Sequence, residues 1–76
     1  MKDKSLQYYA TFFVVLIWDD GNRTYFVVRA KDKNHAITSV EKYAYREWEG
    51  TIVRTRAEPF QVDSEPETPH HLFTEN

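Results

Sequence analysis

Two arginines spaced two positions apart, Arg54 and Arg56, are the residues of this chain whose type and spacing point most directly to chemistry. In an extended strand they share one face, because successive side chains alternate between the two faces. Their planar guanidinium groups form paired hydrogen bonds with carboxylates or phosphates, which is recognition rather than catalysis. The pair therefore predicts a binding role for Arg54 and Arg56. The alternative is an edge strand that uses charge to avoid aggregation.

Other side chains that could support catalysis or metal binding are not arranged for it. Asp19 and Asp20 precede a glycine, which is typical of a tight turn. His35 has no cysteine or carboxylate cluster near it at the spacing of metal ligands. His70 and His71 are adjacent in sequence, so their side chains are poorly placed to bind the same metal ion. No serine has a histidine at a suggestive position, and a chain this short leaves little volume for a catalytic pocket. We expect no enzymatic activity, no cofactor and no metal.

Composition indicates one small folded domain near the lower size limit for a self-sufficient core. The chain has 76 residues, of which 41% are hydrophobic and 16% aromatic. It contains no cysteine, so no disulfide can stabilise it, which fits a reducing compartment. We find no signal peptide, and the apolar run is too short to cross a bilayer as a helix. We expect a cytoplasmic protein, located in the host cytoplasm if the chain is viral.

Charge is unevenly distributed along the chain. Of the twelve acidic residues, four follow Phe60, whereas all ten lysines and arginines precede it. The folded part is therefore about +2, which is too weak to indicate nucleic-acid binding from charge alone. The placement of the arginines carries more information than their number.

The stretch from Tyr8 to Trp18 predicts a strand that is apolar on both faces, followed by a hairpin turn at Asp20-Gly21. With a loop of two or four residues, Trp18 lies opposite Arg23 in a second strand, Arg23 to Ala30. This register predicts a core face of Thr11, Phe13, Val15, Ile17, Phe26, Val28 and Ala30. The open face then carries Phe12, Val14, Leu16 and Trp18 beside Arg23, Tyr25, Val27 and Arg29.

Capping and periodicity predict one helix from Lys33 to Trp48, with Asp32 as its N-cap and Gly50 as its stop. Its buried stripe would consist of Ala36, Ile37, Val40, Ala44 and Trp48. A third strand is expected from Thr51 to Phe60. There, Val53, Thr55 and Ala57 would face the helix, and Ile52, Arg54, Arg56 and Phe60 would join the open face.

The order strand–strand–helix–strand predicts an α+β fold. A right-handed crossover places the third strand beside the first, giving a three-stranded antiparallel-type sheet in the order 2-1-3 with the helix on one face. The predicted organisation is an N-terminal extension at 1–7, a single domain at 8–62 and a flexible acidic tail at 63–76.

These features resemble a small family of phage proteins, the host RNA polymerase inhibitors of lytic coliphages. The hairpin, Ala30 and Ala36 opening the helix, its Tyr/Trp-rich end, and Arg54-x-Arg56 in the last strand carry the resemblance, over about residues 8–60. It implies three strands, one helix, and contact between the paired arginines and the polymerase. The helix mixes Lys33, Lys42 and Arg46 with Glu41 and Glu47. The family carries a strongly acidic face there.

The leading hypothesis is a non-enzymatic phage-type inhibitor that binds a host enzyme, with an RNA polymerase-like target favoured. The residues expected to bind the partner are Arg54, Arg56, Phe12, Trp18, Tyr25, Arg23 and Arg29. The alternatives are an inhibitor of another host enzyme or defence system, similar to the phage inhibitors of uracil-DNA glycosylase or to anti-CRISPR proteins, and a single-stranded nucleic-acid-binding module. A homodimer closed through the open face is the third possibility.

Overall fold

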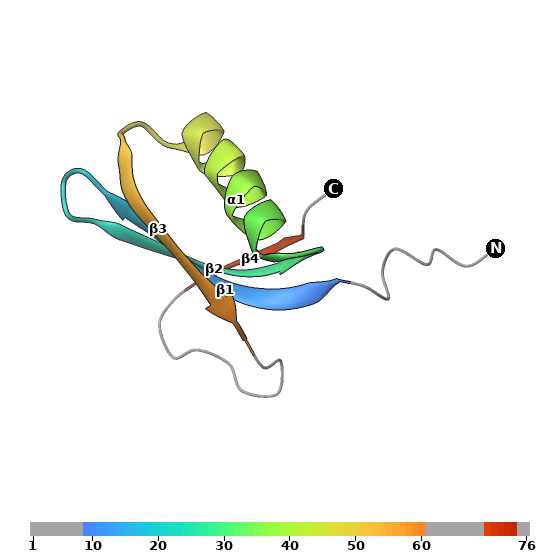
Figure 1. Cartoon of the computed structure of the whole chain (residues 1–76). Coiled ribbons are helices and arrows are strands. Elements are labelled where there is room, and N and C mark those ends of the chain that lie inside the picture. The colour runs from blue at the N-terminus through green and yellow to red at the C-terminus, as the bar shows by residue number, and fades with distance from the viewer. Residues whose placement is uncertain (1–8, 61–69, 75–76) are drawn as a thin grey trace.

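The computed structural model describes residues 9–60 and 70–74, in which one helix packs on one face of a four-stranded sheet (Figure 1). The elements are β1 (Ala10–Trp18), β2 (Arg23–Ala30), α1 (Lys33–Glu47), β3 (Ile52–Pro59) and β4 (His71–Thr74). The strand order is β3-β1-β2-β4, with β1 antiparallel to β2 and β3, and β4 parallel to β2. The α+β class and the order of the first three strands are confirmed. The prediction of three antiparallel strands is wrong, because a fourth strand makes the sheet mixed.

The β1–β2 turn has three residues between its closing pair, not the two or four that were expected. Trp18 N–H donates to the Asn22 carbonyl, and Gly21 N–H donates to the Trp18 carbonyl, each at 2.9 Å. Gly21 has φ +89°, the left-handed conformation that closes such a three-residue turn. The odd number shifts the register by one residue, so that Ile17, and not Trp18, lies opposite Arg23.

The shifted register reverses the predicted faces of β1. A slip of one residue transfers every side chain of a strand to the other face. The prediction for β2 is confirmed, since Phe26, Val28 and Ala30 are fully buried. The prediction for β1 is wrong. Its core side chains are Phe12, Val14, Leu16 and Trp18, whereas Thr11, Phe13, Val15 and Ile17 lie half-buried on the face away from α1.

Helix α1 covers this core with small side chains. Ala36, Val40 and Ala44 are fully buried against the sheet, as the stripe predicted. Ile37 is half-buried, and Trp48, the C-cap, remains 37% exposed, so the stripe is narrower than expected. Small residues let the helix approach closely, and the large side chains of β1 fill the space between them.

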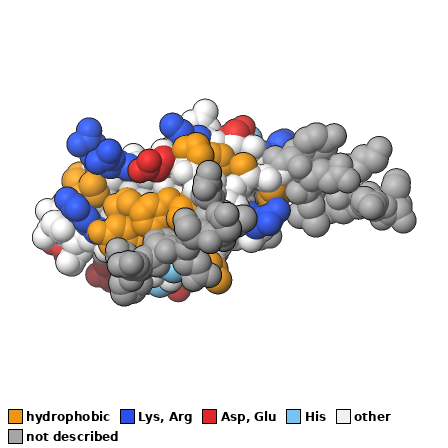
Figure 2. Space-filling model, turned by 90° about the horizontal axis from the view of Figure 1, so that it is seen from below, with side chains coloured by type: hydrophobic (Ala, Val, Ile, Leu, Met, Phe, Trp, Pro, Cys, Tyr) orange, Lys and Arg blue, Asp and Glu red, His pale blue; other side chains and the backbone are white. Residues whose placement is uncertain are grey.

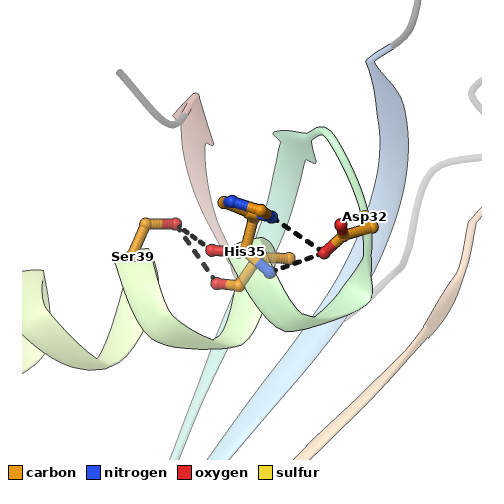
Figure 3. Close-up of polar contacts among 4 residues, drawn as sticks. Asp32, His35 and Ser39 are labelled. Carbon is orange, nitrogen blue, oxygen red and sulfur yellow. Dashed lines mark hydrogen bonds and ion pairs between the residues drawn. The ribbon is translucent and has the colours of Figure 1, made fainter.

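The predicted N-cap of α1 is confirmed at Asp32 (Figure 3). Its carboxylate Oδ1 accepts from the His35 backbone N–H at 2.9 Å and contacts His35 Nδ1 at 3.0 Å. One turn later, Ser39 Oγ donates to the carbonyls of His35 and Ala36. The bond from the His35 backbone N–H, followed by that from its side chain, holds the pKa of Asp32 below its ordinary value of 3.8.

A bulge separates the two ends of β3. Trp18 pairs with Ile52 but Ile17 pairs with Arg54, so Val53 has no opposite residue on β1. Val53 is 60% exposed and Ile52 packs against the core, which is the reverse of the prediction for these two residues. Beyond the bulge the predicted alternation holds: Thr55 and Ala57 are half-buried on the helix side, and Arg54 and Arg56 lie on the other face.

The fourth strand lies within the segment that was expected to be a flexible tail. β4 pairs with β2, and its Phe73 ring packs near Phe26 and Tyr43, at centroid distances of 6.3 and 5.3 Å. His71 contacts Phe26 and Trp48, at 5.1 and 5.5 Å. The tail prediction is therefore wrong for His71–Thr74. The rest of the expected tail and the extension at 1–7 lie outside the described residues, apart from His70.

Substitutions at Leu16 and Ile17 test which face of β1 is buried, because these two residues carry isomeric side chains on opposite faces of the strand. Leu16 is fully buried and Ile17 is half-buried. We expect Leu16→Ala to lower the free energy of unfolding by about 2–5 kcal/mol. We expect Ile17→Ala to lower it by ~1 kcal/mol. Chemical denaturation measures both. A larger loss for Ile17→Ala would contradict the register described here.

The Asp32 cap predicts a dependence of stability on pH. Because folding lowers the pKa of Asp32, its ionised form stabilises the fold above the ordinary value of 3.8. That contribution is lost as the pH falls below this value and through the folded-state pKa. Asp32→Asn keeps a capping group but removes the charge. The stability difference between wild type and Asp32→Asn should therefore be larger near about pH 7 than near about pH 2. A difference that is constant across this range would rule out the charge effect.

Candidate partner-binding surface

The sheet face opposite α1 carries an apolar patch that spans three strands. Side chains from neighbouring strands lie side by side on it because the strands pair in register: Ile17 is flanked by Arg54 and Arg23, and Val15 by Arg56 and Tyr25. We call this surface the sheet-face patch. It consists of Phe13, Val15, Ile17, Tyr25, Val27 and Leu72.

Aromatic contacts order the middle of the patch. The Phe13 and Tyr25 rings stack at a centroid distance of 5.9 Å with an interplanar angle of 15°. Phe60 packs on the other side of Phe13 at 6.0 Å. A depression of about 210 Å³ lies over this region, lined by Phe13, Val15, Ile17, Arg23, Tyr25, Arg56 and Glu58. Stacked rings restrict side-chain motion, so the patch needs little reordering before a partner binds.

Four arginines surround the patch. Arg23 and Arg29 extend from β2, and Arg54 and Arg56 from β3; all four are exposed. None forms a side-chain hydrogen bond or an ion pair with another residue in the described part of the chain. Glu58, opposite Phe13, is the acidic residue on the same face. Figure 2 looks at this face and shows hydrophobic side chains with Lys and Arg side chains beside them. The surface is thus apolar at its centre and positive at its rim.

The structure separates the predicted binding residues into two groups. Arg54, Arg56, Arg23, Arg29 and Tyr25 lie together on the open face, as their alternation along the strands predicted. Phe12 and Trp18 do not join them.

Both rings are buried under α1 and are 7% exposed, so their assignment as partner-binding anchors is wrong. The cause is the odd number of turn residues, which places Phe13 and Ile17 on this face, where Phe12 and Trp18 were expected.

Sequence reasoning missed one member of the patch entirely. Leu72 pairs with Val27 and is 79% exposed, at the free edge of the sheet. The signal was the short segment His71-Leu72-Phe73, whose ring side chains at 71 and 73 fall on one face of a strand and Leu72 on the other. The acidic, proline-containing residues before it masked this pattern.

Residues 9–60 and 70–74 contain neither a cluster of metal ligands nor a membrane-spanning helix. No three His, Cys, Asp or Glu side chains gather there in a way that would hold a metal ion. The same residues include no helix of the length and hydrophobicity that crossing a bilayer requires. Comparison of the chain with protein-family models, curated proteins and solved structures finds no match.

A double-mutant cycle tests the geometry of the patch. We expect the Phe13→Leu and Tyr25→Leu substitutions to be coupled by about 0.5–1.5 kcal/mol, because each removes the same stacked pair. The matched control is Phe12→Leu with Tyr25→Leu. These rings lie on opposite faces, so their coupling should stay within about 0.5 kcal/mol. Denaturant unfolding of the single and double variants supplies both values, and the reverse ranking would place Phe12 on the open face.

Proposed function

We propose that this chain is a non-enzymatic inhibitor that docks its sheet-face patch and the surrounding arginines on an acidic surface of a host enzyme. The observation that carries the proposal is an apolar centre that no described residue covers, together with four arginines that have no ionic partner among the described residues. Interfaces concentrate binding energy in such aromatic and arginine side chains, within a rim that excludes water.

Charge favours a protein partner over a second copy of the same chain. Two copies that meet face to face would bring four arginines from each side together, against one Glu58 from each. Such like charges oppose association. An acidic partner surface instead offers carboxylates that each guanidinium can bind through two hydrogen bonds. We therefore infer a partner with apolar residues at its centre and Asp or Glu at its rim.

The first target to test is a bacterial RNA polymerase. Its support is the resemblance of Arg54-x-Arg56 to the paired arginines of the coliphage inhibitors, and in this fold both arginines lie exposed beside the patch. Uracil-DNA glycosylase and CRISPR effector complexes are the alternative targets of the same surface. Each of these enzymes would place the chain in the host cytoplasm, which suits a chain without cysteine.

Single-stranded nucleic acid is a weaker fit. Of the three aromatic residues expected to stack on bases, Phe12 and Trp18 are buried, which leaves Tyr25. Phe13 lies beside Tyr25, but the two rings already stack on each other. Binding through phosphate contacts would weaken steeply with added salt. Oligonucleotide binding with a steep salt dependence would therefore replace the protein-partner proposal.

Substitution of the paired arginines tests the proposal directly. Arg54→Ala with Arg56→Ala should weaken binding to the purified target by about 100-fold, because two charge-assisted contacts at the rim of the patch are lost. The matched control is Lys33→Ala with Lys42→Ala, which removes the same charge from exposed positions on α1. Calorimetry with RNA polymerase measures affinity, and circular dichroism confirms that both variants fold.

Capture from a bacterial lysate extends this test to other targets. A genuine partner should be retained by the wild type and by the lysine control, and lost by the double arginine variant. If RNA polymerase fails to bind while another enzyme shows this pattern, the surface is correct and the target is not. If all three proteins retain the same partners, the arginine-rimmed surface is not the binding site.

A further inference from the structure

A second hollow lies at the other side of the sheet, where the β1–β2 turn meets the C-terminal end of α1. Figure 1 shows this turn and the α1–β3 connection at the same end of the molecule. The hollow has a volume of about 210 Å³ and is lined by Trp18, Asp19, Asp20, Asn22, Thr24, Trp48, Glu49 and Gly50. Among the described residues, none lines both this hollow and the depression in the sheet-face patch.

Two indole rings form adjacent walls of this hollow. The Trp18 and Trp48 rings have centroids 6.5 Å apart and planes at 84°, so they meet almost at a right angle. Trp48 is 37% exposed, although its ring also contacts Tyr43 at 5.9 Å. An exposed tryptophan held by aromatic neighbours presents a rigid ring face to a ligand.

Trp18 is fixed in place from two sides. Its Nε1–H donates to Thr24 Oγ1 at 2.9 Å. On the other side the backbone of Gly50 lies so close that a Cβ there would be 3.2 Å from Trp18 Cε3. Gly50 also has φ +127°, which a residue with a side chain rarely adopts. The glycine thus lets the chain pass against the ring, and the aromatic corner is formed before any ligand arrives.

The rim of the hollow is negative. Asp19, Asp20 and Glu49 line it, and no lysine or arginine of the described residues does. Asp20 accepts two hydrogen bonds from Asn22, at 3.0 and 2.9 Å. The side chains of Asp19 and Glu49 bond to no other described residue. The hollow also lies at the C-terminal end of α1, the negative end of the helix dipole.

We propose that this hollow binds an organic cation, namely a methylated ammonium or a guanidinium group. The exposed Trp48 ring attracts a cation through its negative face, with the buried Trp18 ring packed against it almost at a right angle, and the carboxylates add to that attraction. A neutral group of the same shape gains only apolar contact, and an anion is repelled. Two sources supply such a cation: a free small molecule, or a methylated lysine or arginine side chain of another protein. This site is independent of the proposed function of the sheet face.

Tryptophan fluorescence reports directly on the site, because the two tryptophans that line it are the only two in the chain. The full chain is titrated with choline and with its uncharged analogue, in which a tert-butyl group replaces the trimethylammonium group. Nα-acetyl-arginine amide and Nα-acetyl-Nε-trimethyl-lysine amide represent protein side chains. We expect a saturable change with cations and none with the neutral analogue. Tighter binding of choline would identify a free small molecule, and tighter binding of the amides a protein side chain.

Charge-removing variants supply the second measurement. Asp19→Asn with Glu49→Gln should weaken cation binding about fivefold, since both carboxylates are exposed and contribute modestly. Glu58→Gln, on the opposite face of the sheet, is the matched control and should leave the affinity unchanged. Shifts of the two indole N–H signals in NMR spectra locate the ligand and verify folding. The proposal is overturned if no cation gives a saturable change, if the neutral analogue acts equally, or if the double variant binds as the wild type does.

Discussion

The three-residue turn between β1 and β2 is the constraint on which the rest of the structure depends. Its two hydrogen bonds join Trp18 to Gly21 and to Asn22, and the left-handed conformation of Gly21 makes this odd number of residues possible. Because side chains alternate with a period of two, the turn decides which side chains of β1 lie beside Phe26. That register therefore decides which side chains of β1 contact α1 and which lie on the open face.

The packing of α1 is the reason this register produces a compact core. The fully buried side chains of the helix, Ala36, Val40 and Ala44, are small, so it lies close to the sheet. The space left beside it is filled by the larger Leu16 and Phe26, both fully buried. Beside β2, the rings of Phe73 and His71 from β4 complete the apolar layer.

The same register leaves two surfaces of opposite charge on one small domain. On the sheet face, cross-strand pairing places arginines of β2 and β3 on either side of the apolar residues of β1. On the helix side, the β1–β2 turn and the residues after α1 bring carboxylates around two indole rings. A positive rim selects acidic partners and a negative one selects cations, so the two proposed sites do not compete for one ligand.

Local signals in the sequence determined the first three strands, the helix with its Asp32 cap and the open-face position of Arg54 and Arg56, because capping and strand alternation act over a few neighbouring residues. Tertiary structure alone decided which face of β1 is buried. Both faces are apolar, so hydrophobicity could not distinguish Phe12 from Phe13, and the three-residue turn settled the choice. It also decided the Val53 bulge and the pairing of β4, since these depend on contacts between residues far apart in the chain.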